Sequence, residues 1–352
     1  MSCTSRNRPL ILHISTGATF RGGERQLEWL HTGLVERGWE SHLLCRKGGV
    51  LAGHTVPNSI QIPWHGEWDI AGLLYMLHQC KKLRPSVLHC HDAHGFSHGS
   101  VVGTILNIPV IYTRRVNFRI RNDFFTRWKY RHAQLIIAIS RDVAEQCYAL
   151  VPPQKVPIIF SGVDWTTELY SRAKAREALH VPDDCFILGS VGHYTGQKNL
   201  PLILKLASEL ALSHPSVKIL CIGPTAIDTS TLPSNIIMAG YVPGAAAYYN
   251  AFDAYVCTST KEGLGTALVD AVVRDIPCVS VDAGGNLDIF PEGTDIVPQG
   301  DCPGLVKAVR ALIDNYKDAQ IKAKEHGLYA RKRFSSTAMI EGYVATYTGL
   351  LG

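Results

Sequence analysis

The sequence predicts an α/β protein with two doubly wound domains, each built on a parallel sheet. Short apolar runs alternate with helix-length amphipathic stretches along the 352 residues. The apolar runs are continuous, which is typical of strands buried on both faces of a parallel sheet. The pattern restarts near residue 186 after a polar stretch, and the length suits two domains of middling size.

Five strands and two helices are expected in the first half. The strands are short apolar runs, and the helices are longer amphipathic stretches. In chain order the strands are 10–15, 41–45, 87–90, 110–112 and 135–139, and the helices are 23–37 and 70–83.

The second half repeats this pattern. Residues 161–184 before it are polar and contain Pro182, so a linker is expected there. Ligands of such sheets bind outside the carboxyl ends of the strands, so the cleft between two facing domains is the expected site. The expected strands are 186–191, 217–222, 236–239, 254–257 and 277–281, and the helices are 200–212, 265–273, 303–316 and 318–333.

Composition excludes several classes of protein. Apolar residues make up 46% and charged residues 18%, which argues against a disordered chain. No apolar run approaches the roughly 18 residues of a membrane span, and the apolar stretch 10–14 is too short for a signal peptide, so we expect a cytosolic protein. Ten scattered cysteines without a C-x-x-C pair disfavour a disulfide framework and a zinc knot.

Charge differs between the halves. Residues 1–180 hold 22 Lys/Arg against 13 Asp/Glu, which is +9, and residues 181–352 hold 13 against 17, which is −4. Within the basic half, residues 112–131 combine six arginines and one lysine with interleaved aromatic residues. Arginines suit phosphate or carboxylate and aromatics suit a lipid headgroup interface; the alternative is a helix with a solvated basic face. No nucleic-acid-binding module surrounds this segment, so nucleic acid is not an expected partner.

A glycine-containing turn, residues 16–24, joins the first strand to the first helix. Glycines there let the backbone approach a ligand, and the helix start favours an anion; the alternative is a plain tight turn. The G-x-G-x-x-G spacing is absent, and the second strand runs into Cys45-Arg46-Lys47 instead of an acidic residue. A nicotinamide-dinucleotide site is therefore disfavoured.

Histidines gather at the end of the strand 87–90. His89 and His91 share one face of that strand, and Asp92, His94 and His98 follow. They could carry protons or bind a metal, or they could be hydrogen-bonded histidines of a polar strand end. No confirming ligand cluster follows in the sequence, so we expect no metal.

Two segments of the second half carry candidate anion-binding residues. Lys198 directly precedes a helix, where it can reach a diphosphate. In residues 258–271, two glycines open a helix after a strand, and Glu262 lies eight residues before Asp270, so both acids can face one ligand. The amides of 263–266 can cradle an anion, whereas the alternative is a helix start with favourable acids.

These residues resemble the signature of the family-4 retaining glycosyltransferases of the GT-B fold. That signature has an E-x7-E element, a helix, a "pVv" strand and a Gly-Gly turn, matched here by Glu262 and Asp270, by 277–281 and by Gly284-Gly285. The resemblance covers nearly the whole chain. Further matches are Gly22-Gly23-Glu24-Arg25-Gln26, Ile139-Ser140, Ser161-Gly162-Val163-Asp164 and Gly300-Asp301.

The resemblance implies roles for these positions. Lys198 would bind the donor diphosphate, Glu262 would hold sugar hydroxyls and Asp270 would bind the ribose. Gly22 and Gly23 would border the phosphates and the acceptor. The implied donor-binding set is completed by His193, Gly263, Leu264, Gly265 and Thr266.

Three positions depart from the family pattern. The second acid is Asp270 instead of Glu, and His193 stands where the family has a phosphate-binding arginine. Thr113-Arg114-Arg115 stands where many members have a histidine near the reacting carbon. His91 or His94 is an alternative for that catalytic place, and Arg114, Arg115 and His94 are the expected acceptor-binding residues.

The sequence therefore predicts a GT-B enzyme that transfers a sugar with retention from a UDP- or GDP-linked donor to a glycan or glycolipid acceptor of bacterial lipopolysaccharide or surface polysaccharide synthesis. Glu262, His91 and Lys198 are the expected catalytic residues, with no metal or other cofactor. The alternatives are a nucleotide-sugar epimerase of the same fold and a non-catalytic nucleotide-sugar-binding protein. Peripheral contact with an anionic membrane surface at the inner face of the cell membrane is also expected.

The expected domains are an acceptor-binding domain at 1–163 and a donor-binding domain at 164–334. The helix 335–352 is expected to pack back on the first of them.

Overall fold

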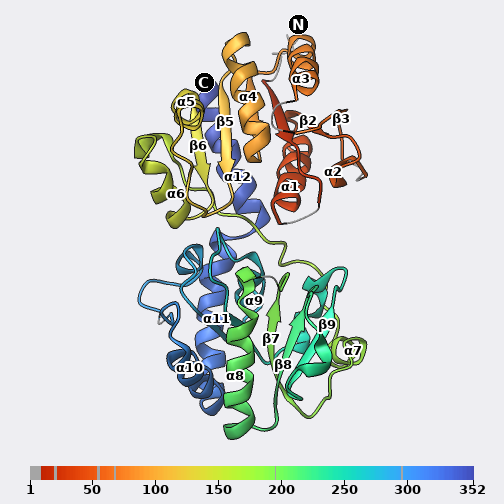
Figure 1. Cartoon of the computed structure of the whole chain (residues 1–352), viewed down its shortest axis with the longest axis vertical. Helices are drawn as coiled ribbons and strands as arrows, with labels where there is room; N and C mark the ends of the chain where they lie inside the picture. Colours follow the sequence, from red (N-terminus) through yellow and green to blue (C-terminus); the bar gives the residue numbers. More distant parts are fainter. Residues whose placement is uncertain (1–8, 20–21, 54–55, 67–68, 195, 295) are drawn as a thin grey trace, which may run out of the picture. The chain divides into compact units, whose positions relative to one another are not determined.

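The computed structural model describes residues 9–352 except 20–21, 54–55, 67–68, 195 and 295 (Figure 1). The chain divides into two compact units. The first comprises Met1–Gly162 together with Ser336–Gly352, and the second comprises Val163–Ser335.

The first unit contains a six-stranded parallel sheet in the order β3-β2-β1-β4-β5-β6. Its strands are β1 Leu10–Ser15, β2 Glu40–Arg46, β3 Ser59–Ile62, β4 Val87–Cys90, β5 Val110–Arg114 and β6 Leu135–Ala138. Its helices are α1 Gly22–Glu36, α2 Val50–Gly53, α3 Ile70–Leu83, α4 Ala93–Leu106, α5 Phe124–His132, α6 Arg141–Tyr148 and α12 Ser336–Leu351. Strand order reverses beside β1 and β4, where doubly wound sheets bind ligands.

The C-terminal helix α12 is part of the core of the first unit (Figure 1). It packs against α1, and Gly33 of α1 leaves room for the side chain of Ile340. Tyr343 and Tyr347 of α12 are fully buried in the cluster that also contains Ile11 of β1. This face of the sheet is therefore closed by residues far apart in the sequence.

The second unit contains a five-stranded parallel sheet in the order β11-β10-β7-β8-β9. Its strands are β7 Phe186–Val191, β8 Val217–Ile222, β9 Ile236–Gly240, β10 Ala254–Cys257 and β11 Cys278–Ser280. Its α-helices are α7 Arg172–Ala178, α8 Leu200–Ser213, α9 Thr266–Val272, α10 Cys302–Asp314 and α11 Tyr316–Arg333. Leu, Ile and Val from α8, α10 and the strands form much of a large core cluster.

The predicted fold class is confirmed, with two parallel-sheet α/β units. Five of the expected strands, 10–15, 87–90, 186–191, 217–222 and 254–257, have the predicted limits. The expected linker 161–184 is not a plain linker, because it contains α7, whose start Ser171 caps. Within α7, Arg176 is fully buried and binds Asp253 with 2.8 Å between Nη2 and Oδ2. This buried ion pair explains why a polar segment belongs to the core of the second unit.

The sequence patterns did not predict α4, whose sequence AHGFSHGSVVGTIL contains three glycines and two histidines. Its helix propensity is low, but Asp92 caps it and its glycines pack against neighbours. A Cβ atom at Gly99 would collide with Cys90 Sγ, and one at Gly103 would collide with Val110. Close packing on the sheet therefore overrides propensity here.

All nine cysteines within the described residues are free, and most are buried in the two cores. Across the described part of the chain, no helix combines the length and the apolar character that crossing a bilayer requires.

Candidate active site

Glu262 and Lys198 form an ion pair at the carboxyl ends of the strands of the second unit. Lys198 Nζ lies 2.8 Å from Glu262 Oε1, and the two side chains are 19% and 12% exposed. Glu262 follows β10, and Lys198 follows β7, which is the neighbour of β10 in the sheet. Two residues 64 positions apart therefore meet, partly buried, where parallel strands present ligand-binding loops.

The backbone holds the Glu262 turn in place. The amide of Glu262 donates to Ala283 O at 2.7 Å, and the amide of Gly285 donates to Glu262 O at 3.1 Å. Gly284 has φ of 85°, and a Cβ atom at Gly285 would collide with Gly263 O. The Gly-Gly turn after β11 is therefore needed for close approach to the turn after β10.

Lys198 is positioned from both sides. The Thr258 hydroxyl donates to Lys198 O at 2.9 Å, and Gly192, with φ of 156°, leaves space for the lysine side chain. Burial alone would lower the pKa of Lys198, but the carboxylate of Glu262 outweighs it and raises the pKa above its ordinary value. Lys198 is therefore cationic at neutral pH, as a group that binds phosphate must be.

The amides proposed for anion binding lie between Glu262 and α9. Leu264 and Gly265 are buried, whereas Gly263 and Thr266 are partly exposed. Gly265 occupies the N-cap of α9, and no side chain caps the helix. A Cβ atom at Gly265 would lie 2.5 Å from Asn286 Oδ1, a buried oxygen that has no hydrogen-bond partner. The Glu262 segment is thus packed tightly while the start of α9 keeps uncapped amides.

Asp270 has its own cation. Arg274 lies one helical turn after Asp270. Its Nη1 atom is 2.6 Å from Asp270 Oδ1, and its guanidinium also lies over the ring of Tyr249. Asp270 can therefore face the same ligand as Glu262 only if its ion pair with Arg274 opens, or if that ion pair holds the Asp270 carboxylate toward the ligand. His193 is exposed, as a residue at the rim of a site would be, and Thr195 lies outside the described residues.

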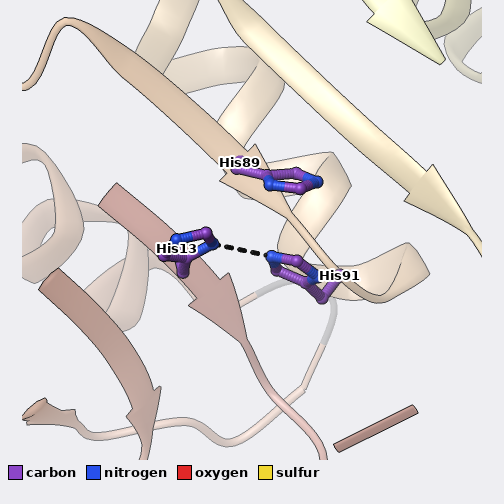
Figure 2. Close-up of side chains that lie close together, drawn as sticks. All are labelled: His13, His89 and His91. Carbon is purple, nitrogen blue, oxygen red and sulfur yellow. Dashed lines mark hydrogen bonds between the residues drawn. The ribbon is translucent and has the colours of Figure 1, made fainter. Parts of the chain in front are cut away.

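Three histidines lie close together on one face of the first unit's sheet, with their rings tilted to one another (Figure 2). His13 of β1 and His89 of β4 are opposite each other in the ladder, and His91 follows on the same face. His13 Nδ1 and His91 Nε2 are 2.9 Å apart, and the rings of His89 and His91 have centroids 4.0 Å apart. Burial, and after it neighbouring positive charges, lowers the pKa of each well below its ordinary value, so all three rings are neutral at pH 7.

These three rings offer ligand atoms within 4.8 Å of one another, a spacing at which imidazoles could hold a metal ion. Five of the six ring nitrogens already have a partner, since His89 bonds Tyr347 and Thr113, and His91 bonds His13 and Arg115. If His91 Nε2 bound a metal, the ring proton would lie on Nδ1. That proton would then face the guanidinium of Arg115, which can only donate hydrogen bonds, so the two donors would conflict. We therefore interpret the cluster as a hydrogen-bonded core network.

The adjacent Arg114 and Arg115 point to opposite faces of the sheet. Arg114 is buried and donates to Tyr130 Oη at 3.3 Å and to the carbonyl of Phe118. Arg115 lies on the histidine side, where its Nη2 is 3.3 Å from His91 Nδ1. Side chains alternate across a strand, which separates the two arginines that the sequence analysis treated as a pair. Arg114 bonds within the fold, so of these two arginines Arg115 remains the candidate for acceptor binding.

The remaining candidates of the first unit lie near Arg115 or on α4. Gly22 and Gly23 begin α1, and a Cβ atom at Gly23 would lie 3.3 Å from Arg115 Cδ. The preceding residues of the turn, 20 and 21, lie outside the described residues. His94 is exposed in the first turn of α4. His91 is buried with both nitrogens engaged, which favours a role in holding Arg115 over direct proton transfer.

His13, Tyr343 and Tyr347 were missed by the sequence analysis, although they complete the histidine network. His13 is in an apolar strand, and a lone polar residue in a buried strand is the signal that could have identified it. The two tyrosines lie on α12, about 250 residues from His89, and nothing in the sequence pairs them with it.

The two doubly wound units and the lysine–glutamate pair at the strand ends agree with the GT-B glycosyltransferase that the sequence predicts. The chain belongs to this class. Residues 20–166 match the model described as "Glycosyltransferase Family 4", and residues 171–333 match "Glycosyl transferases group 1".

Curated relatives are similar at low identity. The capsular polysaccharide biosynthesis glycosyltransferase CapM of Staphylococcus aureus is 22% identical over 80% of this chain and 82% of its own. The lipopolysaccharide core biosynthesis glycosyltransferase LpsD of Rhizobium meliloti is 22% identical over 61% of this chain and 64% of its own.

Solved structures show the same fold. HepE of Anabaena, solved in complex with UDP and glucose, has a TM-score of 0.81 at 16% identity, over 97% of this chain and 100% of its own. A glycosyltransferase of Rickettsia africae has a TM-score of 0.86 at 16% identity, over 98% and 99%.

Proposed function

We propose that the protein transfers a sugar, with retention of configuration, from a nucleotide-sugar to a glycan or glycolipid acceptor in the synthesis of a bacterial surface polysaccharide. The names of CapM and LpsD, which concern capsular polysaccharide and lipopolysaccharide core, support this acceptor class. A structure of HepE in complex with UDP-glucose supports a nucleotide-sugar donor.

The Lys198–Glu262 pair carries the proposal. In transfer, a hydroxyl of the acceptor attacks the anomeric carbon while the nucleoside diphosphate leaves, so negative charge grows on the leaving phosphate. Lys198 would neutralise that charge, aided by the uncapped amides before α9. Glu262 would hold hydroxyls of the donor sugar and keep Lys198 oriented. These roles need only residues that the second unit already holds together.

A screen of nucleotide-sugars by thermal shift tests the donor site. A ligand that binds only the native state raises the melting temperature by mass action, so the physiological donor should give the largest shift. Lys198→Ala should weaken that donor by about 10- to 100-fold, because a charge-assisted hydrogen bond to phosphate is lost. Lys205→Ala, on α8 in the same unit, is the matched control and should bind like the wild type.

The donor so identified is then incubated with a polysaccharide or glycolipid extract. NMR of the product should show the anomeric configuration of the donor. An inverted product would contradict retention, and epimerised or unchanged donor without transfer would support the epimerase or binding-protein alternatives. Lys198→Ala with wild-type donor affinity would remove Lys198 from the phosphate site.

The exposed face formed by α3, α4 and α5 suits an anionic membrane surface. Phe124 is 86% exposed and Ile70 is 71% exposed, and a hollow of about 180 Å³ between these helices is lined mainly by apolar side chains. Arg121 and Arg127 are exposed beside Phe124 in the sequence. Apolar side chains flanked by arginines are the composition that binds anionic lipid headgroups. We include this peripheral contact in the proposed function.

Vesicle sedimentation tests the membrane contact. Vesicles that contain phosphatidylglycerol should bind the protein, and binding should fall as salt rises from 50 to 500 mM because surface charges are screened. The variant Ile70→Ser/Phe124→Ser should bind several-fold more weakly. Leu212→Ser/Leu328→Ser removes equally exposed apolar side chains of the second unit and serves as control. Equal loss in both variants, or no binding at low salt, would contradict the assignment.

A further inference from the structure

The hollow of about 180 Å³ between α3, α4 and α5 is suited to an apolar ligand. Its surface is almost wholly apolar, although three of its seven lining residues are polar. The lining residues are Asp69, Ile70, Leu73, Ser97, His98, Val101 and Phe125. Protein interiors hold few voids larger than a water molecule, and a hollow with apolar walls offers water few hydrogen bonds. Hydrocarbon therefore fills such a space more favourably than water does.

The polar residues of the lining are hydrogen-bonded within the protein. Asp69 caps α3, and its two carboxylate oxygens accept from the backbone amides of Gly72 at 3.0 Å and His65 at 2.9 Å. The Ser97 hydroxyl donates to a backbone carbonyl one helical turn earlier, at 3.1 Å. His98 Nε2 lies 3.2 Å from the backbone oxygen of Asp69. These bonds explain how a partly polar lining leaves an apolar surface.

Contacts with α4 hold one wall of the hollow in place. This wall is Phe125 of α5, and Lys129 Nζ lies 5.6 Å from the centroid of its ring. The same ammonium group is buried and donates to Ser97 Oγ of α4 at 2.9 Å. A cation over an aromatic face is attracted to the ring, so Lys129 links Phe125 to α4. The hollow is therefore part of the packing of these helices.

The surface around the hollow combines exposed apolar side chains with positive charge. Ile70 lines the hollow and is strongly exposed, and the equally exposed Phe124 precedes Phe125. Arg121 and Arg127 are exposed on either side of Phe124 in the sequence. This arrangement is complementary to a hydrocarbon chain that carries an anionic group at its head.

The hollow also lies near the place where the acceptor is expected. The helix α4 follows β4, beside the point where the strand order of the sheet reverses and where doubly wound sheets bind ligands. His94, a candidate acceptor-binding residue, is one helical turn before His98, which lines the hollow. A ligand with its polar head at the strand ends could therefore place a chain in the hollow.

We infer that the hollow between α3, α4 and α5 holds one hydrocarbon chain of a glycolipid acceptor, with an anionic group of that lipid bound by Arg121 and Arg127. The inference rests on the proposed function, because it takes the acceptor to bind the first unit, and it narrows the acceptor class to lipid-linked glycans. An apolar cavity of about 150 Å³ accommodates benzene, so this hollow has room for about six to eight carbon atoms. A membrane lipid could supply a similar chain, and the experiment separates the two sources.

Binding of alkyl phosphates to the full chain tests the hollow. Butyl, hexyl, octyl and decyl phosphate are titrated below their micelle concentrations against protein with ¹³C-labelled methyl groups. The affinity should rise about fourfold for each added methylene and level off beyond about eight carbons, when the hollow is full. NOEs should connect the chain to methyl groups of Ile70, Leu73 and Val101. Inorganic phosphate should shift none of these methyl groups, and octyl glucoside, which has no charge, should bind more weakly than octyl phosphate.

A matched pair of variants checks the location. Val101→Phe fills the hollow and should weaken octyl phosphate binding at least about tenfold. Ile105→Phe adds the same side chain one turn further along α4, at an exposed position outside the lining, and should bind like the wild type. Absence of NOEs to the three methyl groups, or an affinity that still rises from octyl to decyl phosphate as steeply as before, would overturn the inference. Neither observation requires a variant to fold.

Transfer assays distinguish the chain of the acceptor from that of a membrane lipid. The intact glycolipid acceptor is compared with the same acceptor after mild hydrolysis has removed its lipid. The wild type should prefer the intact acceptor, and the ratio of the two kcat/KM values should fall at least about tenfold in Val101→Phe but not in Ile105→Phe. An unchanged ratio in Val101→Phe would overturn the inference, and weaker binding of this variant to phosphatidylglycerol vesicles would then assign the hollow to a membrane lipid. The alkyl phosphate titration needs neither donor nor transfer, so the donor screen can succeed or fail independently.

Discussion

Glu262→Gln is expected to reduce sugar transfer by at least about 100- to 1,000-fold while the protein remains folded. Glutamine keeps the size and the hydrogen-bonding oxygen of the side chain but removes the charge that orients Lys198. Loss of one oriented group that stabilises developing charge typically costs about 10²–10³ in rate. The measurement is kcat/KM with the donor identified by thermal shift, beside a circular dichroism melt.

The ion pair itself offers a sharper control. Glu262→Gln alone leaves Lys198 partly buried and unpaired, so some stability should be lost. The double variant Lys198→Met/Glu262→Gln removes both charges and should recover stability but not transfer. Glu209→Gln, which breaks an exposed ion pair with Arg310 on the same unit, should change neither. Near-normal transfer by Glu262→Gln would refute the assignment of this residue.

Acidification between pH 7.5 and pH 5 is expected to destabilise the first unit strongly. His13, His89 and His91 have folded-state pKa values lowered by burial, whereas in the unfolded chain each titrates near 6.5. Below about pH 6.5 the unfolded state therefore binds protons that the folded state refuses, and stability falls as pH falls. Each histidine contributes up to about 1.4 kcal/mol per pH unit, against a total stability of about 5–15 kcal/mol.

Urea unfolding at pH 7.5, 6.5, 5.5 and 5.0 measures this effect. In His13→Gln the slope of unfolding free energy against pH should decrease, whatever the variant's absolute stability, because one of the histidines that the fold keeps neutral is gone. His94→Gln, which replaces an exposed histidine, should keep the wild-type slope. Stability that is constant from pH 7.5 to pH 5.5 would contradict the buried, neutral state of the cluster.

Much of the fold is local in origin and could be predicted. The continuous apolar runs at β1, β4, β7, β8 and β10 gave these strands their observed limits, because hydrophobic periodicity is recorded in a few consecutive residues. Elements with a different source of stability were missed. The helix α4 depends on glycines that fit against β4 and β5, and α7 depends on Arg176 reaching Asp253, 77 residues away.

The candidate site divides in the same way. The motifs around Glu262 and Lys198 could be recognised separately, because glycines beside charged residues at a strand end are a local signal. Their ion pair, and the docking of the Gly284-Gly285 turn that holds it, could not be recognised, because neighbouring strands in the sheet are distant in the sequence. Arg114 and Arg115 show the opposite case, since strand alternation would have separated them from sequence alone.

By itself, the sequence determined the class of fold, the order along the chain of all its strands but β3, and a set of candidate residues for holding a charged donor, because these depend on periodicity and on side-chain chemistry. Only the tertiary structure decided which charges are neutralised and which remain available. Arg114 donates to Tyr130 and to the carbonyl of Phe118 and leaves only Nε without a partner, whereas Arg115 leaves both Nε and Nη1 without one. The physical reason is that satisfaction of a buried polar group depends on atoms brought within about 3 Å by packing, whatever their distance along the chain.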